Sequence, residues 1–474
     1  MKPVDLTEIC IGVSFRLLGE SQFDPARQFR YVRTDGILVD NLYRIEFDAS
    51  GIATQLNYDP NRQLMQITHG TTGNALLSFG YVYRAEGLLG AITGDHQATH
   101  DYDGLKQLVS ETDAVVQDAY DAVGNRLWRA APPVSVAQRD VYDADNRLMS
   151  SPADGTTFAY DANRNLLSRT NAGGAVKYTY DGLNRLVRVE NAGQAIDYLN
   201  DVDGCMLQRT FTDVNGNTSV ERFQYANRSM LAILGQNGHV KTLFTCDDEG
   251  RLLRRRSRAK LHPAPSKDPH LLFYLQDAFR SVVCLVDWDG NDFLRVDYDA
   301  WGGGSATGKL AGTERFRYRS GFQDTETGLV NFGMRWYDPT LGRWSSQDPL
   351  LVRLIAARDD LTSSYADLEN LHTYVRNNPV GFHDPSGQSP EDMHLRERAQ
   401  LQLIWEAFNV LNRANITAVQ TTEFAPEVSP VVCGIAGVPC LVPQNAANVG
   451  LSAFGTATAS AGPRVMQLAV RVVF

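Results

Sequence analysis

A short motif that recurs at nearly constant spacing constrains this chain more than any other feature. In the first half of the chain a Tyr-Asp dipeptide recurs at intervals of 44, 18, 22, 18 and 20 residues. The tyrosines are Tyr58, Tyr102, Tyr120, Tyr142, Tyr160 and Tyr180. Repetition with a period near 20 residues indicates an array of similar units, each packed against its neighbours. We therefore expect a repeat array.

The residues after the dipeptide are typical of a hairpin corner. Four copies extend to Asp-x-x-(Gly or Asn)-Arg-Leu, from Asp121 to Leu127 (with one insertion), Asp143 to Leu148, Asp181 to Leu186 and Asp247 to Leu252, and weaker copies begin at Asp59, Asp103, Asp161 and Asp201. Aspartate at the start of a tight turn accepts hydrogen bonds from amides two or three residues on, and Gly or Asn adopts the left-handed conformation. The flanking residues alternate apolar with polar, as half-buried strands do. The tyrosines should face inward beside each corner.

Composition and charge exclude several classes of protein. The chain has 474 residues, of which 43% are hydrophobic and 21% charged, so it has ample material for a folded core of two or three domains. The net charge of -10 disfavours a nucleic-acid partner. The basic run 254–260 contains no aromatic residue and is interpreted as a solvated linker. No apolar run is long enough for a membrane helix.

Two further groups of residues could bind a metal or form a disulfide. His96 and His100, with Asp101 and Asp103, have a spacing that would suit a metal, but they fall in a predicted turn and are interpreted as a solvated loop. No metal or other cofactor is predicted. Cys433 and Cys440 are close enough along the chain for a loop disulfide, and two free thiols are the equal alternative.

The segment 317–387, called the core block below, carries a dense series of distinctive motifs. They are Tyr318 to Asp324, Glu326 to Leu329, Arg335 to Pro339, Gly342 to Trp344, Asp348 with Pro349, Asn370 to Pro379, and Asp384 to Gly387. In this order the motifs resemble the Rhs repeat-associated core domain. The whole region from about residue 30 to 387 resembles the Rhs or YD-repeat proteins, which include polymorphic toxins and the C-component of Tc toxins.

The resemblance implies an all-β fold. A YD-repeat β-hairpin array would curl into a spiral shell, partial at this length, closed by the Rhs core domain and followed by a short tail with hairpin strands. The implied divisions are an N-terminal lead-in over 1–30, repeats over 31–316, the core over 317–387 and a variable tail over 388–474. A short helix is expected within 351–369, which looks like an insertion.

The resemblance also implies a single chemical reaction, aspartyl autoproteolysis just downstream of the core block. The matching residues are Asp348 and Asp384, with Arg343 as the arginine that accompanies them. Two carboxylates held close share a proton, so one can activate water while the other protonates the leaving amide. The alternative is that both aspartates merely cap turns, as Asp-Pro commonly does. Gln388 departs from the family, which usually has Leu at that position.

The tail lies where a toxin would follow the core, but it shows neither a basic surface nor a cluster of histidines and carboxylates. Residues 395–474 instead resemble the C-terminal strands of TonB-dependent outer-membrane receptors, on the segments Leu401 to Asn415, Ala453 to Thr456 and Pro463 to Phe474. Two or three strands cannot close a barrel, so no stable membrane insertion is expected. The tail could be a recombined segment, a fusion scar or a surface hairpin.

Three functions remain open on the sequence. The first is a toxin-delivery shell that encapsulates, presents and releases its own C-terminal segment, working with a secretion apparatus or a toxin partner subunit. The second is a non-enzymatic surface or adhesion module, and the third is an Rhs remnant with an inactive, displaced C-terminus. Asp5 and Glu8 interrupt any secretory signal core. Secretion or surface display after a cytoplasmic stage would then need another route or a missing upstream segment.

Overall fold

The structure is a computed structural model. It describes residues 50–349 and 370–387, except 62, 72, 112–115, 131–137, 202–203, 227–228, 248–249 and 260–267, together with strands near both ends of the chain. The chain divides into two units, Met1–Glu397 and Arg398–Phe474, which are described separately. The finer boundaries expected from the sequence remain predictions.

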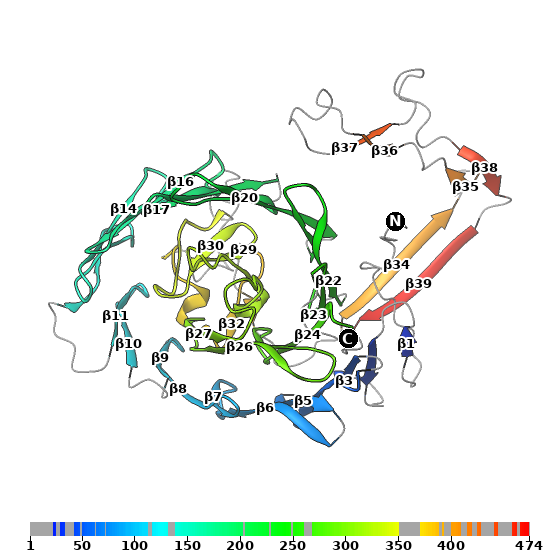
Figure 1. The fold of residues 1–474 in the computed structure, drawn as a ribbon. Coiled ribbons are helices and arrows are strands. Elements are labelled where there is room, and N and C mark those ends of the chain that lie inside the picture. The colour runs from blue at the N-terminus through cyan, green and yellow to red at the C-terminus, as the bar shows by residue number, and fades with distance from the viewer. Residues whose placement is uncertain are drawn as a thin grey trace. The chain divides into compact units, whose positions relative to one another are not determined.

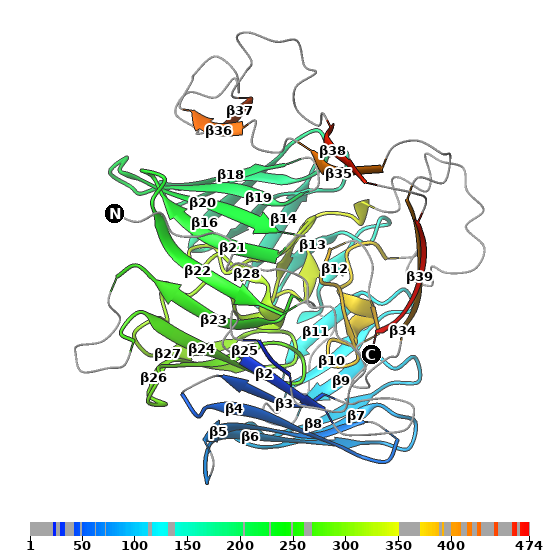
Figure 2. The same ribbon diagram turned by 90° about the vertical axis from the view of Figure 1, so that its right-hand side faces the viewer.

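The first sheet of the larger unit has eleven antiparallel strands in sequence order. They are β1 Gln22–Asp24, β2 Phe29–Arg33, β3 Leu42–Phe47, β4 Ala53–Tyr58, β5 Leu64–Thr71, β6 Asn74–Tyr83, β7 Leu89–Gly94, β8 Ala98–Tyr102, β9 Leu108–Glu111, β10 Val116–Tyr120 and β11 Arg126–Ala130. Each strand pairs with its neighbours along the chain, so the sheet is a continuous meander (Figure 2).

The second sheet has sixteen strands, again in sequence order. They are β12 Val141–Tyr142, β13 Leu148–Ser151, β14 Thr156–Tyr160, β15 Leu166–Asn171, β16 Gly174–Tyr180, β17 Leu186–Asn191, β18 Gln194–Asn200, β19 Met206–Thr212, β20 Thr218–Ala226, β21 Ser229–Gly235, β22 Val240–Cys246, β23 Leu252–Ser257, β24 Leu271–Gln276, β25 Val282–Val286, β26 Asp292–Tyr298 and β27 Gly304–Thr307. Both sheets are built from consecutive hairpins, as a repeat array requires.

The core block forms a small sheet of its own, which the strands of the two large sheets surround in Figure 1. Its strands are β28 Phe322–Gln323, β29 Val330–Phe332, β30 Arg335–Asp338 and β31 Arg343–Trp344, and β32 Phe382–His383 pairs with β33 Glu391–Asp392. Two 3₁₀ turns, η3 Tyr318–Ser320 and η4 Val375–Asn377, complete it. The elements whose bounds the structure describes are strands and these two 3₁₀ turns, so the all-β expectation is confirmed. Residues 351–369, where a short helix was expected, lie outside the described residues.

The hairpin corners follow one hydrogen-bond scheme. At Asp143 the carboxylate oxygen Oδ1 accepts the amides of Asp145 and Arg147, each at 3.0 Å. The amides that donate to the aspartate thus lie two and four residues after it, rather than the expected two or three. Asn146 between them has φ 60° and Gly124 in the preceding corner has φ 79°, the left-handed conformation expected from the sequence. The same scheme also forms corners at Asp213, Asp277, Asp287 and Asp299, which the repeat pattern missed.

Where a tyrosine precedes the corner, it links consecutive hairpins. The Tyr120 hydroxyl donates to the carbonyl of Leu108 at 2.6 Å, and the Tyr142 hydroxyl donates to that of Arg126 at 2.8 Å. In both cases the carbonyl belongs to the start of the preceding return strand, and the ring packs partly buried against the core. The inward orientation expected of these tyrosines is therefore confirmed. The hydrogen bond from the hydroxyl also explains why tyrosine occupies this position, because a buried ring with a polar tip needs a hydrogen-bond partner.

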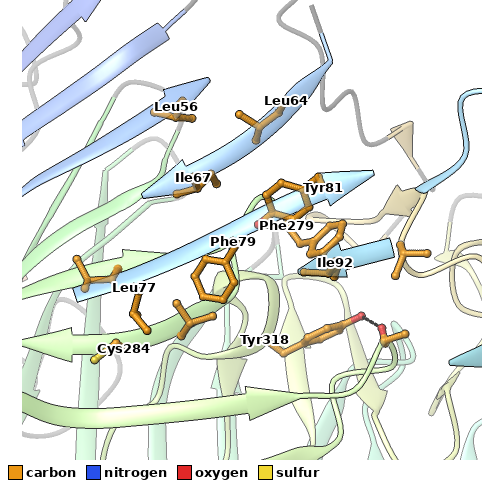
Figure 3. Packing of buried hydrophobic residues seen from close by; sticks show 14 of the residues in the cluster. Leu56, Leu64, Ile67, Leu77, Phe79, Tyr81, Ile92, Phe279, Cys284 and Tyr318 are labelled. Atoms are coloured by element: carbon orange, nitrogen blue, oxygen red, sulfur yellow. Dashed lines mark hydrogen bonds between the residues drawn. The ribbon is translucent and has the colours of Figure 1, made fainter. Parts of the chain in front are cut away.

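The hydrophobic core joins the two large sheets and the core block. Figure 3 shows side chains of β4–β6, such as Ile67 and Phe79, facing Cys284 of β25 and Tyr318 of the core block. The Tyr318 hydroxyl donates to the carbonyl of Ala300 at 2.8 Å. Segments far apart in the sequence therefore share one apolar interior.

The basic run is not a solvated linker. Residues 254–257 belong to β23, where Arg254 donates to Thr245 Oγ1 at 3.1 Å and Arg255 is paired with the buried Glu314. The interpretation was wrong for this part because it counted charges without the apolar residues, Leu252 and Leu253, that begin the strand. Residues 260–267 lie outside the described residues.

In the smaller unit the structure describes three nested strand pairs. They are β34 Gln400–Phe408 with β39 Val465–Val473, β35 Asn415–Val419 with β38 Ala457–Ala461, and β36 Phe424–Glu427 with β37 Cys440–Pro443. Cys433 and Gln388 lie outside the described residues, so the disulfide and the sequence departure stay untested. No helix within the part that the structure describes is long and apolar enough to span a membrane.

Candidate functional site

Three charged side chains gather near a backbone carbonyl at the start of β30. A tight hairpin joins β29 to β30, with Phe332 paired to Arg335 and Gly333 at φ 76° in the turn. The hairpin places Arg335 inside the core block, where the residue is only 3% exposed. A buried guanidinium must find partners for its donors, and those partners define the site.

Arg335 brings the two predicted aspartates together. Its Nη2 atom lies 2.9 Å from Asp348 Oδ2 and 2.8 Å from Asp384 Oδ2. The side chain of Asp348 is 19% exposed and that of Asp384 is 1% exposed, so water reaches the pair from the Asp348 side. Whether the pair is catalytic remains a prediction.

The same guanidinium also contacts the end of the core block. Arg335 Nε donates to the Gly387 carbonyl oxygen at 2.6 Å, a short charge-assisted bond. That carbonyl belongs to the peptide bond between Gly387 and Gln388, just where self-cleavage was expected. One side chain thus joins both carboxylates to a single peptide bond.

The turn from Asp384 to Gly387 can adopt this position only with glycine at its end. Gly387 has φ +65°, and a Cβ there would lie 2.7 Å from the Phe332 carbonyl oxygen and 2.8 Å from the Arg335 amide nitrogen. Within the turn, the Ser386 hydroxyl donates to Asp384 Oδ1 at 3.3 Å and the Met334 amide donates to the Ser386 carbonyl at 3.1 Å. The turn is therefore held against β30 along its whole length.

Arg343, the arginine expected beside the aspartates, points elsewhere. Its Nη2 donates to the Asn146 carbonyl at 2.7 Å, its Nη1 reaches Asn125 Oδ1 at 3.5 Å, and its guanidinium lies 4.9 Å from the Tyr142 ring centroid. It ties two repeat corners to the core block, and Arg335 occupies the place between the carboxylates. Sequence reasoning missed Arg335, although an arginine opening the apolar run of β30 signals a buried charge that needs acidic partners.

Aromatic rings form the floor of the site. The Arg335 guanidinium carbon lies 4.0 Å from the centroid of the Trp344 ring. Phe332, Tyr337 and Tyr374 surround that ring at centroid distances of 6.0, 5.9 and 5.4 Å. Burial raises the pKa of the Tyr374 hydroxyl well above its ordinary value, so that hydroxyl stays neutral. A floor of low polarity strengthens every charge interaction above it.

A second buried ion group fastens the core block to the repeats. Asp324 accepts two hydrogen bonds from Arg209 of β19, at 2.7 and 3.0 Å, and one from the Tyr198 hydroxyl at 2.7 Å. Burial acts against ionisation here, but the hydrogen bonds and charge of Arg209 prevail and hold the pKa of Asp324 at about 2. Among the described residues the Arg209 guanidinium donates only to side chains, so this group lacks the contact to a backbone carbonyl that Arg335 makes.

The histidine group considered for metal binding does not assemble. His96 Nδ1 lies 3.0 Å from Asp297 Oδ1, whereas His100 Nε2 lies 3.8 Å from Glu111 Oε1. His100 is 1% exposed in strand β8, so the solvated-loop interpretation is wrong for it. Over the described ranges no group of three or more His, Cys, Asp or Glu side chains could hold a metal ion.

Comparison with known families gives a clear result for the repeats and most of the core block. The family described as Teneurin YD-shell matches residues 134–262 and 266–380, just over half of the chain. The chain belongs to the Teneurin YD-shell family. In this YD-shell chain the match includes β12–β27 and ends just before Asp384, which agrees with the shell that the resemblance to YD-repeat proteins implied.

Several curated proteins are similar to parts of this YD-shell chain. The tRNA3(Ser)-specific nuclease WapA of Bacillus spizizenii is 28% identical over 296 residues, which are 60% of this chain and 12% of that protein. Toxin subunit YenC1 of Yersinia entomophaga is 28% identical over 37% of this chain and 18% of its own, and toxin subunit YenC2 is 34% identical over 23% and 10%. This chain therefore spans less than a fifth of each of these relatives.

Solved structures share the fold. The TcdB2-TccC3-Cdc42 structure has a TM-score of 0.57 and 18% identity, over 76% of this chain and 20% of that one. TcdB2-TccC3 alone has a TM-score of 0.56 at the same identity and coverage of this chain. The resemblance of residues 395–474 to TonB-dependent receptors finds no support in these comparisons.

Proposed function

We propose that this chain is a toxin-delivery shell protein that presents a C-terminal segment and releases it by hydrolysing the bond between Gly387 and Gln388. One observation carries the proposal. Arg335 contacts Asp348, Asp384 and the Gly387 carbonyl at once, at 2.6 to 2.9 Å. A guanidinium on a carbonyl oxygen is placed to stabilise the negative charge that develops there when water attacks.

The reaction divides the remaining work between the two aspartates. Asp348 is the more exposed and is assigned as the base that takes a proton from the attacking water. The water oxygen bonds to the Gly387 carbonyl carbon, and the bond to the nitrogen of residue 388 breaks. Asp384, after taking up a proton, is assigned as the acid that protonates this nitrogen. The products are a carboxylate at Gly387 and a free amine at Gln388.

The relatives support the delivery part of the proposal. Two of them are toxin subunits and one is a nuclease, and each is much longer than this chain. By analogy we assign to this chain secretion, an association with a toxin partner subunit, and enclosure of its own segment 388–474 by the shell. This segment follows directly from the turn that Arg335 holds.

The test is incubation of the purified full chain, followed by denaturing electrophoresis and mass measurement of the fragments. We expect a fragment ending at Gly387, with a bell-shaped dependence of the rate on pH because one carboxylate must be charged and the other protonated. Asp348→Asn, Asp384→Asn and Arg335→Lys should leave the chain uncut. Asp143→Asn, in a repeat corner, should cut normally. An intact wild-type chain over days at every pH tried would refute the release step.

The same contacts would suit a shell that presents its segment without cutting it. Arg335 contacts both carboxylates and anchors the Gly387 carbonyl, which is also how a purely structural clamp would be built. An uncut wild-type chain that Arg335→Lys makes more sensitive to added protease near residue 388 would favour this second function.

A further inference from the structure

We infer that Trp344 is a positioning residue of the self-cleavage site, because its indole face sets the plane of the Arg335 guanidinium. The inference rests on the proposed cleavage and adds to it a residue that does not touch the reacting peptide bond. Trp344 belongs to β31, the strand next to Arg335 in the small core-block sheet.

The geometry is that of a close cation–π contact. The guanidinium carbon lies 4.0 Å from the ring centroid, and both residues are almost fully buried. Such contacts are strongest when desolvated, and arginine stacks its flat group on aromatic faces. The ring therefore restrains the tilt of the guanidinium.

The tilt matters because the three polar contacts alone do not fix it. Both carboxylates lie on the same atom, Nη2, so they act as a pivot about which the flat group can turn. Only the Nε contact to the Gly387 carbonyl opposes that rotation, and it is the contact that the reaction uses. A face beneath the guanidinium keeps Nε directed at the carbonyl while the bonding there changes.

Trp344 is itself held rigidly enough for this role. Its amide donates to the His372 carbonyl at 2.9 Å, and its backbone pairs with Tyr337 of β30. Phe332 and Tyr374 pack against its ring nearly edge-on. The indole is thus fixed from its backbone and from its edges, and a face remains for Arg335.

Trp336 provides a matched control. It follows Arg335 in β30 and is buried to the same degree as Trp344. Its ring, however, packs at a tilt against Tyr198 of β18, with ring centroids 4.6 Å apart, in a separate cluster of buried apolar side chains that does not contain Trp344. A Trp→Leu change at either position removes the same volume from the same small sheet, but only one of them removes the face beneath Arg335.

The experiment compares Trp344→Leu, Trp344→Phe and Trp336→Leu in the full chain by two readouts. The first is the rate of self-cleavage, and the second is the rate at which phenylglyoxal labels Arg335, followed by peptide mass mapping. We expect Trp344→Leu to slow cleavage about tenfold and to speed labelling several-fold. Trp344→Phe, which keeps an aromatic face, should restore both rates to within about threefold of wild type. Trp336→Leu should leave both rates near wild type despite lower stability.

The two readouts separate this inference from the proposed function. If wild type does not cut but labelling responds as expected, the cleavage proposal fails and the positioning role stands. If wild type cuts but labelling of Arg335 is the same in Trp344→Leu and Trp336→Leu, the positioning role is overturned and the cleavage proposal stands. Equal defects in Trp344→Phe and Trp344→Leu would also overturn it, because the aromatic face would then be irrelevant.

Discussion

Aspartate has local hydrogen-bond partners in the repeat corners and distant partners in the core block. Asp143 accepts amides of its own turn and pairs with Arg147, four residues on, and its side chain is 22% exposed. Asp324 and Asp384 are almost fully buried, and their arginine partners lie 115 and 49 residues away. The corner is a local structure that a few consecutive residues can form by themselves. The core-block pairs exist only when the whole shell has folded, so the two regions should respond very differently to mutation.

The largest contrast is expected between a buried and an exposed ion pair. Arg209→Leu leaves Asp324 uncompensated at 0% exposure and should destabilise the larger unit by about 3–5 kcal/mol. Arg188→Leu breaks an exposed repeat-sheet pair with Asp197 and should cost at most about 1 kcal/mol. Denaturant midpoints of the two variants measure the difference. Similar midpoints would show that the core block is not fastened through Asp324.

Acidification should lower the folding stability mainly through the core block. Burial lowers the pKa of His372 to about 3 from an ordinary value of 6.5. His372 is therefore protonated in the unfolded chain but neutral in the folded chain over this pH range. The folding stability falls as the pH drops from about 6.5 towards 3. At pH 5 the loss should be about 2 kcal/mol.

Denaturation at pH 7 and pH 5 for wild type and His372→Gln measures this loss. The variant should lose less stability than wild type between the two pH values. Asp277, a half-buried aspartate in a repeat corner, works in the opposite direction. Loss of hydration raises its pKa to about 6, so its ionisation disfavours folding as the pH rises from about 4 to 6. An Asp277→Asn chain should therefore lose more stability than wild type on acidification. Identical slopes in all three chains would contradict the assignment.

A smaller effect is expected when either of two glycines with a left-handed backbone is replaced by alanine. Gly387→Ala meets the Phe332 carbonyl at 2.7 Å, whereas Gly216→Ala at a repeat corner, with φ +82°, meets nothing within 4 Å. Gly216→Ala should cost about 1 kcal/mol from backbone conformation alone, and Gly387→Ala about 1–3 kcal/mol and most of the self-cleavage. Thermal midpoints and the cleavage assay test both. Equal effects at the two sites would show that the turn is not pressed against β30.

The smallest effect concerns the corner chemistry itself. Lys106 adopts φ 64° in the corner that starts at Asp103, a conformation that glycine reaches without strain. Lys106→Gly should raise stability by up to about 1 kcal/mol, and Lys106→Val should lower it by a similar amount. The thermal midpoints of the two variants, compared with wild type, measure these changes in stability. If both melt like wild type, the left-handed corner contributes nothing measurable.

The amino-acid sequence was sufficient for the local half of this molecule. Corners such as Asp121 and Asp181 are specified within five residues, because the aspartate, the left-handed position and the strands on either side all lie in one short segment. The strands were indicated by the alternation of apolar and polar residues beside these corners, and the all-β class by the resemblance to YD-repeat proteins. Even there, the corner at Asp299 was missed, because Gly303 and Gly304 stand where the other copies have Arg-Leu.

The site depended on contacts that no local pattern encodes. The sequence motifs identified Asp348 and Asp384, but they suggested Arg343, which tertiary structure directs to the corners around Asn125 and Asn146. Which arginine meets the carboxylates depends on the face of β30 and β31 from which each side chain leaves, and on how the turn ending at Gly387 folds back onto β30. Corners are decided by backbone conformation over a few residues. Burying a charge requires partners from distant strands, and only the assembled sheets determine where those partners lie.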